Sequence, residues 1–234
     1  MTHHFDTELN ELKQKLLAMA SQAETAVNQA VQALTDRDHS LALQVKENDK
    51  VLDQFEIEID DLAVHLLAKA PLASDLRLIT VAMKICQNLE RVGDEAAKVA
   101  KRARDLSQEP PLKHSQEIPK MAQLAVGMLK QSLDAFVNHD PAAARALIPR
   151  DKEVDSLNKQ IHRELAHLMI ADPEAITRCL NLMVVSKSLE RIADHATNVA
   201  EEVVYLCEAQ DIRHPASIDQ TKAPEVVQDP GSKH

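Results

Sequence analysis

The chain has 234 residues, with only three Gly and 2% aromatic residues. It is rich in Ala, Leu, Lys, Glu and Gln, which lose little side-chain freedom in a helix, so the composition indicates an almost wholly helical protein and argues against a β-protein. The formal net charge of −10 argues against nucleic acid as a partner, because proteins bind nucleic acid largely through Lys and Arg.

The first half of the chain predicts three long helices. Apolar residues at steps of three and four run from residue 9 to residue 34, which is typical of one amphipathic helix. A second helix is predicted over 41–69, before Pro71, and a third over 74–106 with Ser74 as its N-cap. The first members of the apolar stripe, all expected to face the core, are Leu9, Leu12, Leu16 and Met19.

The second half repeats this plan after a polar segment that contains Pro110 and Pro111. Helices are predicted over 118–138, 141–170 and 173–209. The region from Asp211 onward has scattered charge and few periodic apolar residues, so we expect a disordered and dispensable tail. The predicted division is a first bundle over 1–107, a linker over 108–116, a second bundle over 117–209 and a tail over 210–234.

The two halves are related by sequence. The segment LERVGDEAAKVA at 89–100 returns as LERIADHATNVA at 189–200, with seven identities in twelve positions. Matches at an offset of 102 extend through the preceding helices and include acidic residues, which a hydrophobic core alone does not require. The predicted fold is therefore all-α, with two tandem three-helix bundles related by internal duplication.

The chain lacks the signals of a membrane or exported protein. No apolar run approaches the roughly 20 residues that span a bilayer, and the first six residues do not resemble an export signal. We therefore expect a cytoplasmic protein without direct membrane insertion. Cys86, Cys179 and Cys207 are odd in number and widely spaced, which is typical of reduced thiols.

Four pairs of acidic residues lie at i and i+4 on helix faces, at matched positions in the two halves. Like charges one turn apart destabilise a helix by about 0.2–0.5 kcal/mol unless something neutralises them. Hard multivalent cations prefer carboxylate oxygens, so the pattern predicts one metal cluster in each bundle. His195, beside one pair, is a further candidate ligand, although its counterpart is Glu95. The pairs are Asp49/Asp53, Glu90/Asp94, Asp151/Asp155 and Glu190/Asp194.

Two other interpretations remain open at this point. The acidic faces could simply be solvated, with Arg91 and Arg191 offsetting the repulsion, in a passive helical scaffold. A carboxylate-bridged metalloenzyme is the second alternative, since Glu164 and His167 have the spacing of di-iron bundles. That motif occurs only once, and the chain has no phosphate loop or nucleophile motif, so an enzyme is the weaker interpretation.

Three segments together resemble the PhoU family of bacterial phosphate-signalling regulators. They are HFDTELNELKQKLLAM at 4–19, SDLRLITVAMKICQNLERVGD at 74–94 and KSLERIADHATNVAEEVVY at 187–205. The resemblance covers about residues 5–206, and it implies two similar three-helix bundles.

The resemblance also implies a function. Family members are non-catalytic cytoplasmic regulators that restrain the phosphate-starvation response and modulate phosphate uptake. The implied partners are the ATPase subunit of the phosphate ABC transporter and the phosphate-sensing histidine kinase, with recruitment to the inner membrane through these partners. A homodimer is also expected.

The family's Glu/Asp-x-x-x-Asp motifs bind multinuclear clusters of iron or zinc, or of manganese- or magnesium-like ions. The family commonly has an acid where this chain has Asn88 and Ser188, and Glu95 and Lys98 interrupt a His-x-x-Asn motif in the first half, so the resemblance implies a firmer second site. The implied ligands are Glu90, Asp94, Glu190 and Asp194, with Asp49, Asp53, Asp151 and Asp155 from the preceding helices and His195 from the intact His-x-x-Asn motif.

Overall fold

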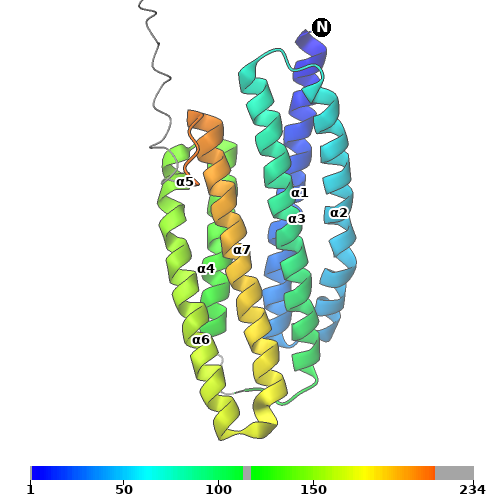
Figure 1. The fold of residues 1–234 in the computed structure, drawn as a ribbon. Coiled ribbons are helices and arrows are strands. Elements are labelled where there is room, and N and C mark those ends of the chain that lie inside the picture. Colours follow the sequence, from blue (N-terminus) through cyan, green and yellow to red (C-terminus); the bar gives the residue numbers. More distant parts are fainter. Residues whose placement is uncertain (1, 113–116, 214–234) are drawn as a thin grey trace, which may run out of the picture.

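The computed structural model describes residues 2–112 and 117–213, and this part of the chain contains helices and no strand (Figure 1). The first half consists of α1 (Thr2–Asp36), α2 (His39–Leu67) and α3 (Ala73–Ser107). The second half consists of α4 (Glu117–Asn138), α5 (Pro141–Leu147), α6 (Asp151–Ala171) and α7 (Ile176–Glu208), with short 3-10 turns at Ile148–Arg150 and Pro173–Ala175. The all-α tandem-bundle prediction is confirmed. Residues 113–116 of the predicted linker and 214–234 of the predicted tail lie outside the described residues.

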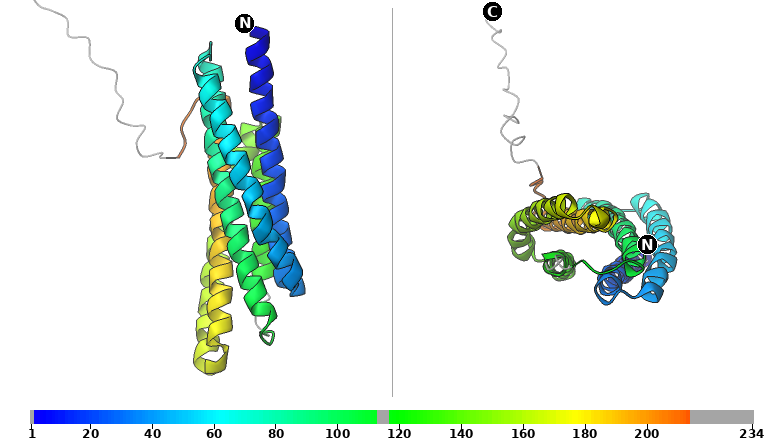
Figure 2. Two further views of the ribbon diagram at one scale, coloured as in Figure 1. Left: turned by 90° about the vertical axis from the view of Figure 1, so that its right-hand side faces the viewer. Right: turned by 90° about the horizontal axis from the view of Figure 1, so that it is seen from below.

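The two bundles lie side by side, and Figure 2 shows the same arrangement from the side and end-on. Helices α3 and α7 pack along each other at the centre, whereas α2 and α6 form the two outer edges. The last helix of each half therefore makes the main contact between the halves, and α1 and α4 also touch across it.

The middle helix of the second half is interrupted, so the prediction of one continuous helix over 141–170 is wrong. A 3-10 turn at Ile148–Arg150 separates α5 from α6. Pro149 lies inside this turn and explains it, because proline has no amide donor and its ring clashes with the carbonyl four residues earlier. The interruption makes Asp151 the first residue of α6.

Aspartate side chains cap the helix starts at repeated positions. Asp38 accepts from the Leu41 amide at 3.0 Å, and its counterpart Asp140 accepts from the Ala142 and Ala143 amides at 3.0 and 2.9 Å. The predicted N-cap at Ser74 is wrong. The N-cap position is occupied by Leu72, two residues earlier, whose side chain makes no cap hydrogen bond, and helix α3 starts at Ala73.

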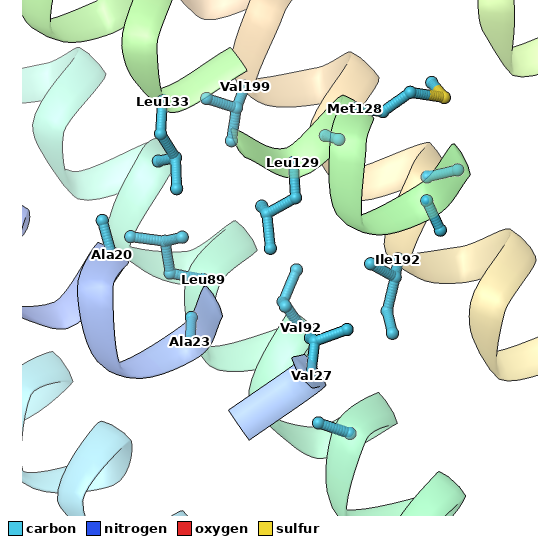
Figure 3. Close-up of a cluster of buried hydrophobic side chains, with 14 of the residues drawn as sticks. Ala20, Ala23, Val27, Leu89, Val92, Met128, Leu129, Leu133, Ile192 and Val199 are labelled. Carbon is cyan, nitrogen blue, oxygen red and sulfur yellow. The ribbon is translucent and has the colours of Figure 1, made fainter. Parts of the chain in front are cut away.

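The hydrophobic core runs through both bundles. The predicted stripe of α1 is confirmed, since Leu12 and Met19 are fully buried and Leu16 is 1% exposed. Figure 3 shows side chains from both halves meeting in one cluster. The members labelled there include Val27 of α1, Val92 of α3, Leu129 of α4 and Ile192 of α7, and they belong to one continuous core. The two halves therefore share one hydrophobic core.

Arg37 holds the end of α3. Its guanidinium donates to the carbonyls of Leu106 at 2.7 Å and Ser107 at 3.2 Å, and also to that of Glu109. The Leu106 and Ser107 carbonyls belong to the last turn of α3, where carbonyls have no amide partner further along the helix, although that of Leu106 also accepts from the Glu109 amide at 3.2 Å. Arg37 therefore links the end of α3 to the start of the segment that joins the halves.

We expect Arg37→Ala to lower the free energy of unfolding by about 1 kcal/mol, because hydrogen bonds to a charged group contribute about 1.5–3 kcal/mol and partial exposure to solvent weakens them here. Amide exchange in the last turn of α3 should accelerate in the same variant, as measured by mass spectrometry. Arg178→Ala is a matched control, because Arg178 donates to Pro110 at 3.2 Å in the same segment but not to α3. Unchanged exchange at the end of α3 in Arg37→Ala would contradict this role.

Candidate metal centres

The second half brings four predicted acidic residues together between α6 and α7. Burial, together with repulsion from Asp151, Glu190 and Asp155, raises the pKa of Asp194 to about 6, against a lowering effect of Lys187. Burial also raises the pKa of Asp151, with Asp155 and Glu190 adding to the effect and a hydrogen bond to Asp194 opposing it. Each helix supplies two carboxylates, one turn apart, to this second acidic cluster (Asp151, Asp155, Glu190 and Asp194).

The first half forms the corresponding first acidic cluster (Asp49, Asp53, Glu90 and Asp94) between α2 and α3. The pKa of Asp49 is raised by burial and by repulsion from Asp53 and Asp94. The pKa of Glu90 is likewise raised by burial and by Asp94, with Asp53 contributing. The structure thus gathers all eight carboxylates into two matched clusters.

Glu56 is a neighbour of the first cluster that the sequence comparison missed. Its charge contributes to the raised pKa of Glu90. It follows Asp49 by seven residues on the same face of α2, which was an available signal. A search for acidic residues at matched positions of the two halves does not find Glu56, because its counterpart Asn158 is not acidic. Asn158 instead accepts a hydrogen bond from Ser186 at 2.7 Å in the core.

Gly93 allows α2 and α3 to approach closely beside the first cluster. A Cβ atom at this position would lie 2.3 Å from Leu52 Cδ1 and 3.5 Å from Asp49 Oδ1. The missing side chain therefore makes room for Leu52, whereas the distance to Asp49 is an ordinary contact.

The donor chemistry of both clusters suits a hard cation. Asp151 Oδ1 and Glu90 Oε2 are buried and accept no hydrogen bond, although Arg91 Nε lies 3.3 Å from Glu90 Oε2. A bound cation would satisfy such oxygens and remove the repulsion that raises the pKa values.

The side chains are not, however, arranged as a closed ligand set. Within residues 2–112 and 117–213, no group of three or more His, Cys, Asp or Glu residues could hold a metal ion as placed. Basic side chains occupy the clusters instead. Arg91 lies 3.3 Å from both Glu90 and Asp94, and Lys187 is hydrogen-bonded to Glu190. Metal binding would require these contacts to rearrange.

His195 lies at the contact between the two halves. Its Nδ1 is 2.9 Å from Asn88 Oδ1 of α3, and Asn198 donates to the same oxygen at 3.1 Å. Burial lowers the pKa of the ring, which favours the neutral form. The structure thus directs His195 toward α3, and its role as a ligand of the second cluster stays a prediction.

Glu95, the counterpart of His195, makes the reciprocal contact. Its buried carboxylate accepts from Arg191 of α7 at 3.1 Å and from Lys98 at 2.9 Å, and it also bonds to Ser188. These bonds lower the pKa of Glu95 against the opposing effect of its burial. Lys98 also lies near Asp49, whose pKa its positive charge lowers, so this departure from the His-x-x-Asn motif places a positive charge beside the first cluster.

Glu164 and His167 lie on the exposed surface of α6. Glu164 accepts a hydrogen bond from Gln160 at 2.8 Å. This pair therefore does not belong to the second acidic cluster, and the structure gives no support to a di-iron arrangement there.

The second acidic cluster predicts a pH dependence of stability. A raised native pKa means that the folded metal-free protein binds a proton at Asp194 more tightly than the unfolded chain. The protonated side chain of Asp194 therefore stabilises the folded protein near pH 4. This stabilisation is lost as the pH rises through about 6, where the side chain ionises in the folded protein. Asp194→Asn removes this loss, so the variant should gain about 1 kcal/mol on the parent between pH 4 and 7, after allowance for solvent screening. Urea unfolding with chelator present measures the difference, and a pH-independent difference would contradict the raised pKa.

No helix in the described part of the chain combines the length and the apolar character required to cross a membrane.

The family model described as the PhoU domain matches residues 16–103 and again residues 118–203.

Several known proteins are similar over nearly the whole chain. A phosphate-specific transport system accessory protein PhoU homolog of Pseudomonas aeruginosa is 44% identical, covering 92% of this chain and 91% of that protein. The corresponding homolog of Rhizobium meliloti is 38% identical and is covered to 86%, as is this chain. The crystal structure of PhoU from Pseudomonas aeruginosa matches with a TM-score of 0.85 and 43% identity, covering 88% of this chain and all of that one. PhoU from Streptococcus pneumoniae, a phosphate transport system regulatory protein, matches with a TM-score of 0.83 and 29% identity, covering 89% of this chain and 99% of that one.

Proposed function

The chain belongs to the PhoU family, and from this premise we propose that it is a non-catalytic regulator of phosphate transport. In this role it restrains the phosphate-starvation response when phosphate is plentiful, by linking the ATPase subunit of the phosphate ABC transporter to the phosphate-sensing histidine kinase. The observation that carries the proposal is the match of both halves to relatives named as accessory proteins of phosphate-specific transport. The protein would act in the cytoplasm as a homodimer, recruited to the inner membrane by its partners.

We further propose that the two acidic clusters hold metal in the functional protein. The expected ligands are the eight carboxylates of the two acidic clusters, and His195 joins those of the second cluster after a change of contact. Iron, zinc, manganese and magnesium are the candidate metals. The proposal is supported by the matched clusters, their raised pKa values and their buried oxygens without hydrogen bonds.

A complementation experiment tests the regulatory role. The chain is expressed in a bacterium whose own PhoU gene is deleted and which carries a reporter driven by a phosphate-starvation promoter. We expect low reporter activity in phosphate-rich medium and normal induction on starvation. High activity in rich medium, with the protein present at normal levels, would refute the role.

Elemental analysis of protein purified without chelator tests the metal proposal. Bound metal that is lost in Asp151→Asn and Asp194→Asn would support it. No metal, with stability unchanged when metal is added, would favour a passive scaffold. Turnover of a phosphorylated or redox substrate that Asp194→Ala abolishes would favour a metalloenzyme.

A further inference from the structure

We propose that Lys187 is a built-in counter-cation of the second acidic cluster, which a metal ion must displace before Glu190 and Asp194 become its ligands. The inference rests on the proposed metal site, and it identifies a residue of the chain that would set the affinity of that site.

The contacts of Lys187 place its ammonium group in the cluster. It lies one turn before Glu190 on α7 and donates a hydrogen bond to Glu190 Oε2. Its charge also acts on Asp194, whose pKa it lowers against the effects of burial and the neighbouring acids. The side chain of Glu190 is 13% exposed, whereas that of Lys187 is 47% exposed. Lys187 therefore neutralises a shielded carboxylate while it retains an open path to solvent.

Lys187 leaves the cluster only partly neutralised. One ammonium supplies a single positive charge to four carboxylates, and Asp151 Oδ1 on α6 remains buried without a hydrogen bond. A divalent cation supplies two charges and could bridge carboxylates of α6 and α7. Because Lys187 already donates to Glu190 and would place its positive charge beside a cation bound there, the ammonium group and the cation compete for this carboxylate.

The internal repeat provides a comparison within the same molecule. The position that matches Lys187 in the first half is Gln87, which carries no charge. There, Arg91 contacts the acids Glu90 and Asp94 instead. Its counterpart Arg191 bonds to Glu95 of the other half and not to its own cluster. The two clusters thus have different counter-cations, and Lys187→Gln gives the second cluster the residue of the first.

Manganese binding to the full chain tests the proposal. All variants carry Asp49→Asn and Asp94→Asn, which weaken the first cluster, and free Mn²⁺ is measured by electron paramagnetic resonance. We expect Lys187→Gln to bind Mn²⁺ about fivefold more tightly, the factor that matches the upper value for an exposed ion pair. Lys187→Arg keeps the charge and should bind as the Lys187 protein does. Lys130→Gln makes the same change in net charge at an exposed position of α4 and should have no effect.

The outcomes separate this inference from the proposed metal site. If Mn²⁺ binds but Lys187→Gln leaves its affinity unchanged, or if Lys130→Gln tightens binding equally, the counter-cation role is wrong and the metal site stands. If neither the Lys187 protein nor Lys187→Gln binds Mn²⁺, and Asp194→Asn behaves the same, the metal site and the inference both fail. Circular dichroism of each variant verifies that the helices are intact.

Discussion

Leu129→Ala is expected to lower the free energy of unfolding by about 2–5 kcal/mol, the usual cost of removing a buried leucine side chain and leaving a cavity. Leu129 is fully buried on α4, in the cluster where α1, α3, α4 and α7 meet (Figure 3). Because this cluster belongs to both halves, the loss should destabilise both together. Urea unfolding followed by circular dichroism should show one transition at a lower midpoint.

The response of each half of the same variant can be measured separately. Amide exchange measured by mass spectrometry should accelerate in α2, which belongs to the first half, as well as in α6. Leu124→Ala is a useful control, because Leu124 is only partly buried on the same helix and should cost less. Two separated unfolding transitions, with only the second half affected, would show that the halves are independent.

The second large effect is expected from metal. If the second acidic cluster binds a cation in the folded state only, an excess of about 100 times Kd adds about 2.7 kcal/mol to the free energy of unfolding. A chelator should therefore lower the melting temperature of metal-loaded protein. Differential scanning calorimetry with and without chelator measures the shift.

Asp194→Asn separates ligand loss from relief of repulsion. The metal-free variant should be as stable as the metal-free parent or slightly more so, because one repelling charge is removed from the cluster. It should nevertheless gain less stability from added metal than the parent does. Equal stabilisation of parent and variant by iron, zinc, manganese and magnesium would show that Asp194 is not a ligand.

The helices could be predicted because their causes are local. The apolar stripe of α1 has helical spacing. Helix α2 ends at Leu67, shortly before Pro71, because proline has no amide donor and cannot continue a helix. Pro149 carried the same signal inside the second half, and it was missed because the repeat favoured a continuous helix there. Ser74 has the right chemistry for a cap, but the chain enters the helix at Leu72 instead.

The acidic clusters could be predicted from spacing, whereas their neighbours could not. Two acids one turn apart must share a helix face, and the family resemblance implied which helices pair. The contacts of His195 with Asn88, and of Lys187 with Glu190, depend on how α3 and α7 pack and on which rotamers the side chains take. No sequence pattern specifies these features, and they determine which residues can reach a metal.

The reciprocal contacts of α3 and α7 indicate how the chain arose. Asn88 meets His195, and the counterparts Ser188 and Glu95 meet each other, so the contact has the form of a twofold interface between identical subunits. A half-length ancestor could have paired with a second copy of itself through this one helix. Fusion of the two genes would make that dimer permanent at any protein concentration. It would also release each side of the interface from symmetry, so that one contact could become an amide with an imidazole and the other a hydroxyl with a carboxylate.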